Sequence, residues 1–454
     1  MSDSDLDPAS RSTLTSFPSD GSASQLSESD TSCPEIYLDT SSQHSLALPD
    51  ASPCSSPSPS SPVFIVKRRS LLKLSFITLS FIAMTLLIFP IALWYIYHKI
   101  IKTLKESNKV SLLSRSLTLF FVIFLFFSAT FLRFFISGSS FFTFAFFAIS
   151  DFSFGLIFAL SFCLLLSTAV HYLLLRFSTF SIQKPHFSVL IVGLIGTVLL
   201  FLIGAYFATN IKTTTYNIST PHIQSPLKIG IATDLHLNGV YYKQGLLDKI
   251  RKKSLREEVD TLFLLGDIID IADPQQVFDK QDIYTSTLST VAPYGTFAVL
   301  GNHDRISGTE ETSTILRDGG ITLLSNEAFL FRDEVLFYGL HDYRSGEETV
   351  KHFHYLSQQN ASLPVSIVLV HQPHDELVDA LNDLNNPSTF IMLAGHTHNG
   401  QVFPGNLIVP LVFTHNYGHY QYGNNHVVVS SGIATWGPLI RLFTRSEFVV
   451  ININ

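Results

Sequence analysis

The sequence predicts an α/β fold for residues 221–454, preceded by an all-α membrane domain with several spans. Only 14% of the 454 residues are charged, against roughly 25% in an average soluble domain. Of the 39 phenylalanines, 26 lie in residues 63–220. Beyond residue 220, five short apolar runs each end in Asp, Asn or His. This composition excludes a wholly disordered chain, a coiled coil and a collagen-like repeat.

The formal net charge of −7 is distributed unevenly along the chain. Residues 1–62 carry −8, residues 63–220 carry +11 and residues 221–454 carry −10. We therefore predict three domains with these boundaries. The net acidity argues against a nucleic-acid partner, whereas the basic middle segment suits a lipid bilayer.

Residues 1–62 are predicted to form a disordered, acidic tail rich in Ser and Pro. The stretch 51–62 is almost entirely Ser and Pro. Such a segment has too little apolar surface to offset the entropy lost on ordering. Its first 30 residues lack a charged start followed by an apolar run, so we expect no cleavable signal peptide.

Residues 63–220 are predicted to cross the membrane about four times, although three or five spans also fit. A run of 24 residues covers the ~30 Å hydrocarbon core at ~1.5 Å per residue. Trp94, Tyr95 and Tyr97 end the first run, as aromatic residues do at a membrane interface. The predicted spans are residues 74–97, 117–136, 144–175 and 188–208.

Asp151 is the one acidic residue within these runs. An unpaired carboxylate in a membrane is costly, so Asp151 is either functional, paired with Arg133 or located in a loop. Basic residues flank the first span on both sides, which leaves the membrane face of the last domain undetermined. We expect a multi-pass integral membrane protein.

The five apolar runs of the last domain predict buried strands. Each contains four to six residues rich in Val, Ile, Leu and Phe and is bounded by Gly, Pro or Asp. Ligands of layered α/β folds bind beyond the carboxyl ends of strands, so we expect the polar residues there to converge. The runs are residues 228–233, 261–265, 296–300, 366–370 and 390–394.

The residues that follow these runs have the chemistry of metal ligands. Imidazole and carboxylate groups suit Zn, Fe or Mn. Seven such residues are enough for two divalent cations if one carboxylate bridges them. A pair ~3.5–4 Å apart can hold a hydroxide that attacks phosphorus in line. The set is Asp234, His236, Asp267, Asn302, His371, His396 and His398.

The strings DLH, GDIID, GNHD, HQP and GHTHNGQ together resemble the calcineurin-like metallophosphoesterase superfamily. With the segment SSGIATWGPLIRLFTRSEFVV, they are similar to its membrane-attached branch, in which several spans precede the catalytic domain. The resemblance covers roughly residues 225–454. It implies an α/β/β/α sandwich that hydrolyses a phosphoester or a pyrophosphate with two divalent metal ions.

The resemblance also implies a role for each motif residue. Asp234, His236 and His398 match the ligands of the first metal. Asn302, His371 and His396 match those of the second, and Asp267 matches the carboxylate that bridges the two metals. The catalytic residues implied are His303, which binds no metal and either stabilises the transition state or protonates the leaving oxygen, Asp304, which orients His303, and Asp270, an acid behind the ligands.

We therefore expect a membrane-anchored phosphohydrolase that acts on a phosphorylated small molecule or a lipid-linked phosphate. Two alternatives stay open: a transporter or signalling membrane protein with a regulatory phosphoesterase domain, and a non-catalytic scaffold. Arg441, near the end of the chain, is expected either to contact a substrate phosphate or to pair with Glu447.

Overall fold

The computed structural model describes most of the chain from residue 87 onward. The predicted tail, residues 1–62, and most of the first predicted span lie outside the described residues. The structure describes residues 87–130, 141–177, 185–237, 244–270, 286–343, 345–359, 363–384 and 388–454.

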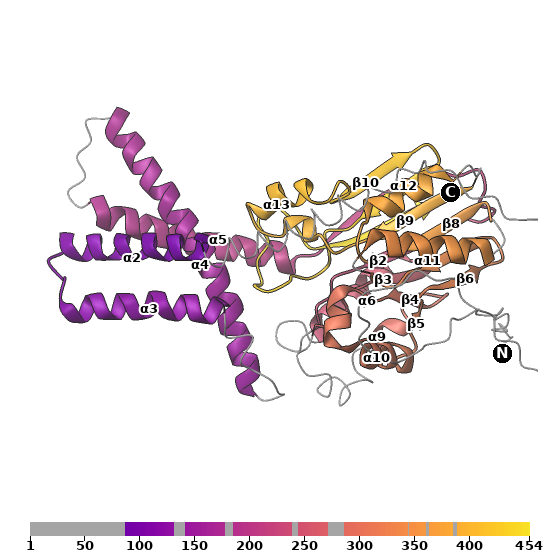
Figure 1. Ribbon diagram of the computed structural model, residues 1–454, viewed down its shortest axis with the longest axis horizontal. Coiled ribbons are helices and arrows are strands. Elements are labelled where there is room, and N and C mark those ends of the chain that lie inside the picture. The colour runs from indigo at the N-terminus through magenta and orange to yellow at the C-terminus, as the bar shows by residue number, and fades with distance from the viewer. Residues whose placement is uncertain are drawn as a thin grey trace, which may run out of the picture.

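In the described part of the chain, four helices precede the sheets and lie to the left in Figure 1. They are α2 (Phe89–Glu106), α3 (Leu112–Thr130), α4 (Phe141–Phe177) and α5 (Pro185–Thr209). Among the described residues, two stretches are long and apolar enough to cross a membrane: 30 residues of α4, Ala148–Phe177, and the 25 residues of α5. The predicted multi-span domain is not confirmed by these two helices and stays a prediction.

Helix α2 continues to Glu106, nine residues beyond the predicted end of the first span at residue 97. Its last turns contain Lys, Leu and Ile, which favour a helix whether or not lipid surrounds them. The Glu106 carboxylate accepts hydrogen bonds from the backbone N–H groups of His186 (3.3 Å) and Phe187 (2.8 Å). A negative charge at this position satisfies the free N–H groups at the start of α5.

Asp151 lies within α4, and its side chain is buried. The prediction that it could lie in a loop is wrong, because the apolar residues on both sides continue the helix through it. Its predicted partner, Arg133, lies outside the described residues. Near Asp151, the Ser128 hydroxyl of α3 donates a 2.7 Å hydrogen bond to Ser153 of α4.

Two six-stranded sheets follow among the described residues, and the first includes β1, so this domain begins before the predicted boundary at residue 221. In the first sheet β12 pairs with β1 in parallel and with β2 in antiparallel orientation, and β2 to β5 are all parallel. Its strands, in spatial order, are β1 (Lys212–Ile218), β12 (Glu447–Ile453), β2 (Leu227–Ala232), β3 (Thr261–Leu265), β4 (Thr296–Val299) and β5 (Thr322–Leu323).

The second sheet is parallel at its centre, from β11 through β9 and β8 to β7, and antiparallel at both edges. Its strands, in spatial order, are β10 (Gly418–Tyr422), β11 (Asn425–Val429), β9 (Thr389–Ala394), β8 (Val365–Leu369), β7 (Val335–Gly339) and β6 (Glu327–Phe331).

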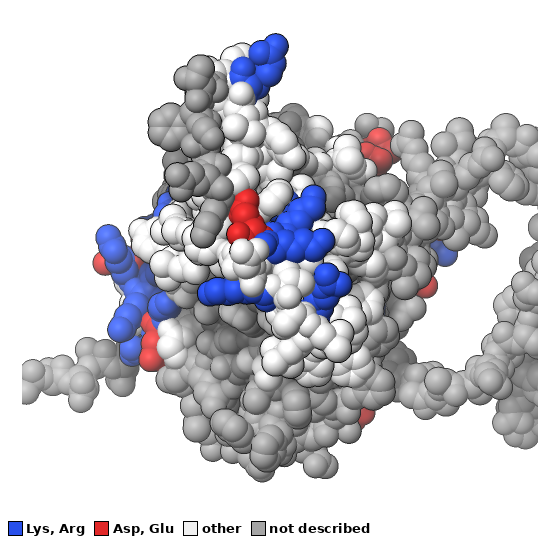
Figure 2. All heavy atoms as spheres, turned by 90° about the vertical axis from the view of Figure 1, so that its left-hand side faces the viewer, with Lys and Arg blue, Asp and Glu red and all other residues white. Residues whose placement is uncertain are grey.

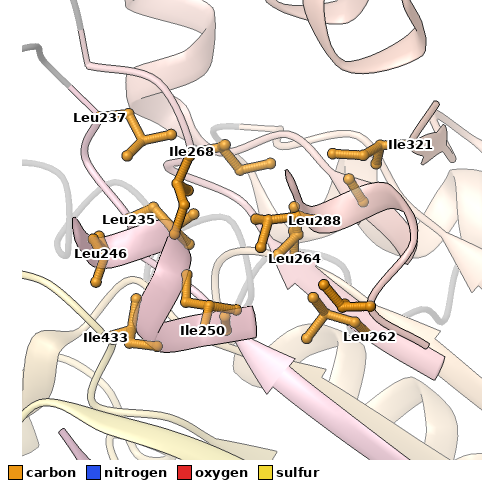
Figure 3. Packing of buried hydrophobic residues seen from close by; sticks show 14 of the residues in the cluster. Leu235, Leu237, Leu246, Ile250, Leu262, Leu264, Ile268, Leu288, Ile321 and Ile433 are labelled. Atoms are coloured by element: carbon orange, nitrogen blue, oxygen red, sulfur yellow. The ribbon is translucent and has the colours of Figure 1, made fainter. Parts of the chain in front are cut away.

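The two sheets pack face to face, and helices cover their outer faces (Figure 1). Side chains such as Ile229 and Phe263 of one sheet and Phe337 and Ile367 of the other form a common core. Alternate residues of the first sheet point outward, against α6 (Gln244–Glu257), α9 (Ser286–Ser289) and α10 (Asn302–Asp318). Figure 3 shows Leu262 and Leu264 of β3 in one cluster with Leu246 and Ile250 of α6 and Leu288 of α9. The second sheet is covered by α11 (Gly346–Gln359) and α12 (Asp375–Asp383). The layers follow the implied order α/β/β/α.

The helical segment is joined closely to the sheets. Only Asn210 and Ile211 separate α5 from β1. The Arg441 backbone N–H donates to the Gly204 carbonyl (3.0 Å), and the Ser446 N–H donates to that of Phe207 (3.1 Å). Lys249 of α6 donates through Nζ to the Thr209 carbonyl (2.9 Å). These bonds attach the end of α5 to the domain at several points.

Candidate metal centre

Five of the seven predicted ligands have a left-handed backbone, a conformation that costs a residue with a Cβ of the order of 1–3 kcal/mol. Such strain persists only where the surrounding structure fixes it, and it concentrates at functional sites. The five residues follow β2, β3 and β9. Their φ angles are 57° (Asp234), 44° (His236), 49° (Asp267), 71° (His396) and 48° (His398).

Glycine allows these turns to approach one another. Gly266, with φ of 78°, precedes Asp267, and a Cβ at this position would lie 2.6 Å from Nδ1 of His371. Glycine both adopts this backbone conformation freely and leaves room for the imidazole. The turn after β3 in one sheet thereby meets the turn after β8 in the other.

The first group of ligand atoms belongs to Asp234, His236 and His398, all of which are buried. His398 Nε2 lies 3.4 Å from Asp234 Oδ1 and 3.1 Å from His236 Nε2. Burial, together with the neighbouring His236, lowers the pKa of His398 well below its ordinary value. A neutral imidazole is the form that binds metal.

The second group belongs to Asp267, His371 and His396. His371 Nε2 lies 3.2 Å from Asp267 Oδ2 and 3.2 Å from His396 Nδ1. Burial, together with His371, lowers the pKa of His396 to about 3. The buried Asn302 Oδ1 has no hydrogen-bond partner among the described residues. A buried acceptor without a donor is costly, and a cation would satisfy it.

Asp267 connects the two groups. Its Oδ2 lies 3.9 Å from His236 Nε2 of the first group and 3.2 Å from His371 Nε2 of the second. Burial opposes the charged form, but His371 and His236 hold the pKa of Asp267 well below its usual range. The donor set of two carboxylates, one amide and four imidazoles therefore fits two divalent cations around a shared carboxylate.

Neighbouring groups hold two of the imidazoles in place. His371 Nδ1 lies 2.8 Å from the Leu265 carbonyl oxygen, so it carries the proton and leaves Nε2 for a metal. His236 Nδ1 lies 3.2 Å from Asp270 Oδ2. Such outer contacts fix the tautomer and the ring orientation of a ligand.

Asp270 lies behind the ligand His236, as the resemblance implies, but it also takes the role that was implied for Asp304. His303 Nδ1 lies 3.1 Å from Asp270 Oδ1, so Asp270 is the acid that holds this ring. The buried Asp304 carboxylate instead accepts hydrogen bonds from the N–H groups of Gly301 (2.7 Å), Ile268 (3.0 Å) and Ile269 (2.7 Å). Burial, together with the charge of Asp267, raises the pKa of Asp304 to about 7. Asp304 thus fixes the backbone beside Asp267 because its short side chain reaches main-chain donors.

Arg441 is fully buried and holds a loop together. It donates through Nη2 to the carbonyl groups of Ser431 (2.6 Å) and Ala434 (2.5 Å) and through Nη1 to that of His398 (3.3 Å). With its guanidinium directed at main-chain carbonyls, it positions the turn that carries His398. Neither predicted role for Arg441 is among these contacts.

Two aromatic residues at the centre were not predicted. The ring centroids of Trp436 and His303 lie 6.1 Å apart, and those of Phe413 and His396 lie 5.6 Å apart. Gln401 fixes Trp436, because its side chain accepts from the Trp436 N–H (2.9 Å) and donates to its carbonyl oxygen (2.8 Å). The only sequence signal was that Gln401 and Trp436 both lie within the motif strings.

Comparison with known proteins identifies the class. Residues 227–400 match the model of the calcineurin-like phosphoesterase family. A metallophosphoesterase of Campylobacter jejuni is 32% identical over 263 residues, which cover 56% of this chain and 67% of that protein. The chain belongs to the metallophosphoesterases, and its domain is that of a metal-dependent phosphoester hydrolase.

Two further relatives carry more specific names. Phosphodiesterase YaeI of Escherichia coli is 28% identical over 244 residues, covering 50% of this chain and 83% of that protein. A transmembrane protein with metallophosphoesterase domain of Danio rerio is 27% identical over 248 residues, covering 51% of this chain and 54% of that protein. Together with the two apolar helices, the second relative indicates an association with membranes.

Proposed function

We propose that the chain is a membrane-anchored phosphohydrolase with a dinuclear metal centre. Its proposed domains are a tail, residues 1–62, a helical membrane segment, and a catalytic domain that begins at β1. One observation supports this proposal above the others: two groups of three possible metal ligands lie side by side, and Asp267 of the second group also lies near His236 of the first. The Asn302 oxygen, which has no hydrogen-bond partner among the described residues, adds a further possible ligand. One group has a net charge of −1 from Asp234 and the other −1 from Asp267. Two divalent cations would leave the centre positive and able to attract a phosphate.

Bound divalent cations, whether Mn, Fe or Zn, would supply an activated water and neutralise phosphate oxygens. The chain supplies the geometry: His371 and His236 are held by Leu265 and Asp270, and the Asp267 loop is held by Asp304. Such preorganised surroundings need no rearrangement during the reaction.

His303 is placed to give a proton to the leaving oxygen. Its side chain is 19% exposed, whereas those of the ligands His371 and Asp267 are 0% and 3% exposed. Asp270 engages Nδ1, which leaves Nε2 available to a substrate. Burial alone would lower the pKa of His303, but the hydrogen bond and charge of Asp270 raise it, which favours the protonated ring that a general acid needs.

A metal and substrate screen of the purified full-length chain tests this proposal. Metal-stripped protein is reloaded with Mn, Fe or Zn and assayed with a phosphomonoester, a phosphodiester and pyrophosphate, while bound metal is counted by emission spectroscopy. We expect two metals per chain and hydrolysis of at least one substrate class. One metal per chain, or two without hydrolysis of any substrate, would contradict the proposal.

A further inference from the structure

An exposed apolar surface lies beside the candidate metal centre. We call it the apolar rim and define it as Phe403, Leu407, Ile408, Leu411, Trp436 and Phe443. Its members come from the turn after β9, which includes α13 (Gly405–Ile408) and η4 (Val409–Leu411), and from the loop before β12. Leu411 is 77% exposed and Phe443 76%. A cluster of large apolar side chains left this open to water is costly and usually marks an interaction surface.

The rim reaches the reacting groups directly. Trp436 packs near His303, and Gln401 connects Trp436 to the turn that carries His398. The Gln401 carbonyl also accepts from the Leu442 N–H at 2.9 Å, which ties the two rim loops together. Through Trp436 the rim therefore lies beside His303 and is not remote from the candidate metal centre.

The backbone at Phe443 is strained while its ring faces solvent. Its φ of 64° is rare for a bulky side chain, and its ring contacts Phe403 at a centroid distance of 5.7 Å. A residue such as Asn would adopt this conformation at lower cost. A strained aromatic residue that is not needed for a core points to a role at the surface.

The rim continues the surface of the two candidate membrane helices. Phe403 contacts Phe162, in the middle of α4, at a centroid distance of 5.7 Å. Next to the rim, Pro438 and Ile440 pack at the α4 glycine Gly155 and the α5 glycine Gly204. Figure 1 likewise shows α13 on the side of the domain that faces the helices. Where α4 and α5 are surrounded by lipid, the rim is at the level of lipid as well.

We infer that the apolar rim is immersed in the bilayer surface, and that the metal centre takes the phosphate of a membrane lipid whose acyl chains remain among the rim side chains. The inference rests on the proposed function, and it narrows the substrate from any phosphate ester to an amphiphile. Trp and Phe beside a phosphate site suit this boundary, because aromatic rings favour the interface between headgroups and hydrocarbon.

Tryptophan fluorescence tests the immersion independently of catalysis. The chain has two tryptophans, so Trp94→Phe leaves Trp436 as the only reporter. The full-length variant is reconstituted in phosphatidylcholine vesicles with or without lipids brominated near the headgroup. We expect brominated lipid to quench the Trp436 emission. Unchanged emission would overturn the inference and would indicate that water, a second copy or another protein covers the rim.

Two synthetic diesters test the choice of substrate. p-Nitrophenyl hexadecyl phosphate and p-nitrophenyl methyl phosphate share their leaving group: water adds to phosphorus, and nitrophenolate leaves with the electron pair of the broken P–O bond. We expect the Mn-loaded chain to favour the hexadecyl ester in kcat/KM by about tenfold or more. In the rim variant, which combines Phe443→Asn with Leu411→Ser, the ratio of the two kcat/KM values should fall towards one. The control Leu255→Ser, at an exposed site on α6, should keep the ratio of the wild-type chain.

The outcomes separate the inference from the proposed function. Hydrolysis of both diesters at equal kcat/KM would overturn the lipid inference and leave the phosphohydrolase intact. If neither diester nor any substrate of the metal screen is hydrolysed, the proposed function fails, and with it the substrate choice. A preference for the hexadecyl ester that survives in the rim variant would also overturn the inference.

Discussion

Asp267 is the residue on which both halves of the candidate centre depend, because its carboxylate lies near imidazoles of each ligand group. We predict that Asp267→Asn removes bound metal and hydrolysis together, since an amide has no charge to share between two cations. Metal content by emission spectroscopy and diesterase rate would be measured on the same sample. Asp383→Asn, an exposed change at the end of α12, serves as the control. Two metals retained per chain would show that the ligand assignment is wrong.

His303 is predicted to transfer a proton to the leaving oxygen and not to bind metal. We expect His303→Ala to lower turnover by roughly 100–10,000-fold, the usual range for a proton-transfer group, while the metal content stays unchanged. The effect should shrink for a substrate with a good leaving group such as nitrophenolate, which needs little protonation. Loss of metal in this variant would refute the assigned role.

Arg441 should matter for stability, because several carbonyl groups depend on one buried guanidinium. We predict that Arg441→Met lowers the free energy of unfolding by roughly 2–5 kcal/mol, the cost of leaving buried acceptors without donors. Arg441→Lys should recover little, since one ammonium cannot reach the same set of carbonyls. Chemical denaturation checks both variants. A loss of activity at full stability would instead favour contact with a substrate phosphate.

At the scale of elements, the strands that carry motifs could be read from the sequence. The runs 261–265 and 390–394 reappear as β3 and, with one added residue, as β9. Their apolar side chains are buried on both faces, so a continuous apolar run marks them. Strands β6, β10 and β12 carry no such motif, and β12 pairs with partners more than 200 residues away, which no local pattern reveals.

In the candidate site, too, features that depend on local sequence could be predicted, whereas contacts between distant residues could not. The order of ligands along the chain indicated the seven residues, because each follows a strand. Which acid holds His303 depends on which side chain reaches it, and the sequence offers an acid in each of two motifs, Asp270 in GDIID and Asp304 in GNHD. The contact of Trp436 with His303 joins residues 133 positions apart and left no trace in the spacing.

The β10–β11 hairpin contains a pH-sensitive pair. His419 Nε2 lies 2.9 Å from Nδ1 of the buried His426, and burial, together with His419, lowers the pKa of His426 to about 4. In the unfolded chain this imidazole takes up a proton near pH 6.5. The stability that depends on neutral His426 is therefore present above about pH 6.5 and lost as the pH falls towards about 4.

We predict that His426→Gln makes unfolding less sensitive to acid. The decrease in Tm between about pH 7 and about pH 5 should be smaller than in the wild-type chain. Metal-stripped samples would be compared, so that the release of metal from the centre does not contribute. An equal or larger decrease in the variant would contradict the assignment.

At the scale of the whole molecule, a basic turn lies at the end of the helical segment that is remote from the sheets, while Lys249 lies at the other end. The turn between α2 and α3, with Lys102, Lys105 and Lys109 around it, lies beside the start of α5 through Glu106, whereas the end of α5 enters the catalytic domain. Figure 2 looks at the first end and shows Lys and Arg side chains gathered on it. If α5 crosses a membrane, its two ends lie on opposite sides, and the positive-inside rule keeps the basic turn in the cytoplasm. On that condition we predict that the metal centre faces the other side.

Cysteine labelling checks this orientation. In a chain whose Cys33 and Cys54 are replaced by Ser, leaving the buried Cys163, single cysteines are placed at Ser111 and Ser225. We predict that Ser225→Cys reacts with a membrane-impermeant maleimide in intact cells, and that Ser111→Cys reacts only after permeabilisation. Labelling of both positions from one side would show that α5 does not cross the membrane.

The two-residue connection between α5 and β1, followed by seven paired residues along β12, holds the catalytic domain at a fixed height above the helices. With so short a tether, the domain has little freedom to turn towards bulk solution or to reach another membrane. For a lipid substrate the encounter then becomes a search in two dimensions. The rate should follow the mole fraction of substrate in the enzyme's own bilayer, and vesicles without enzyme should keep their substrate intact.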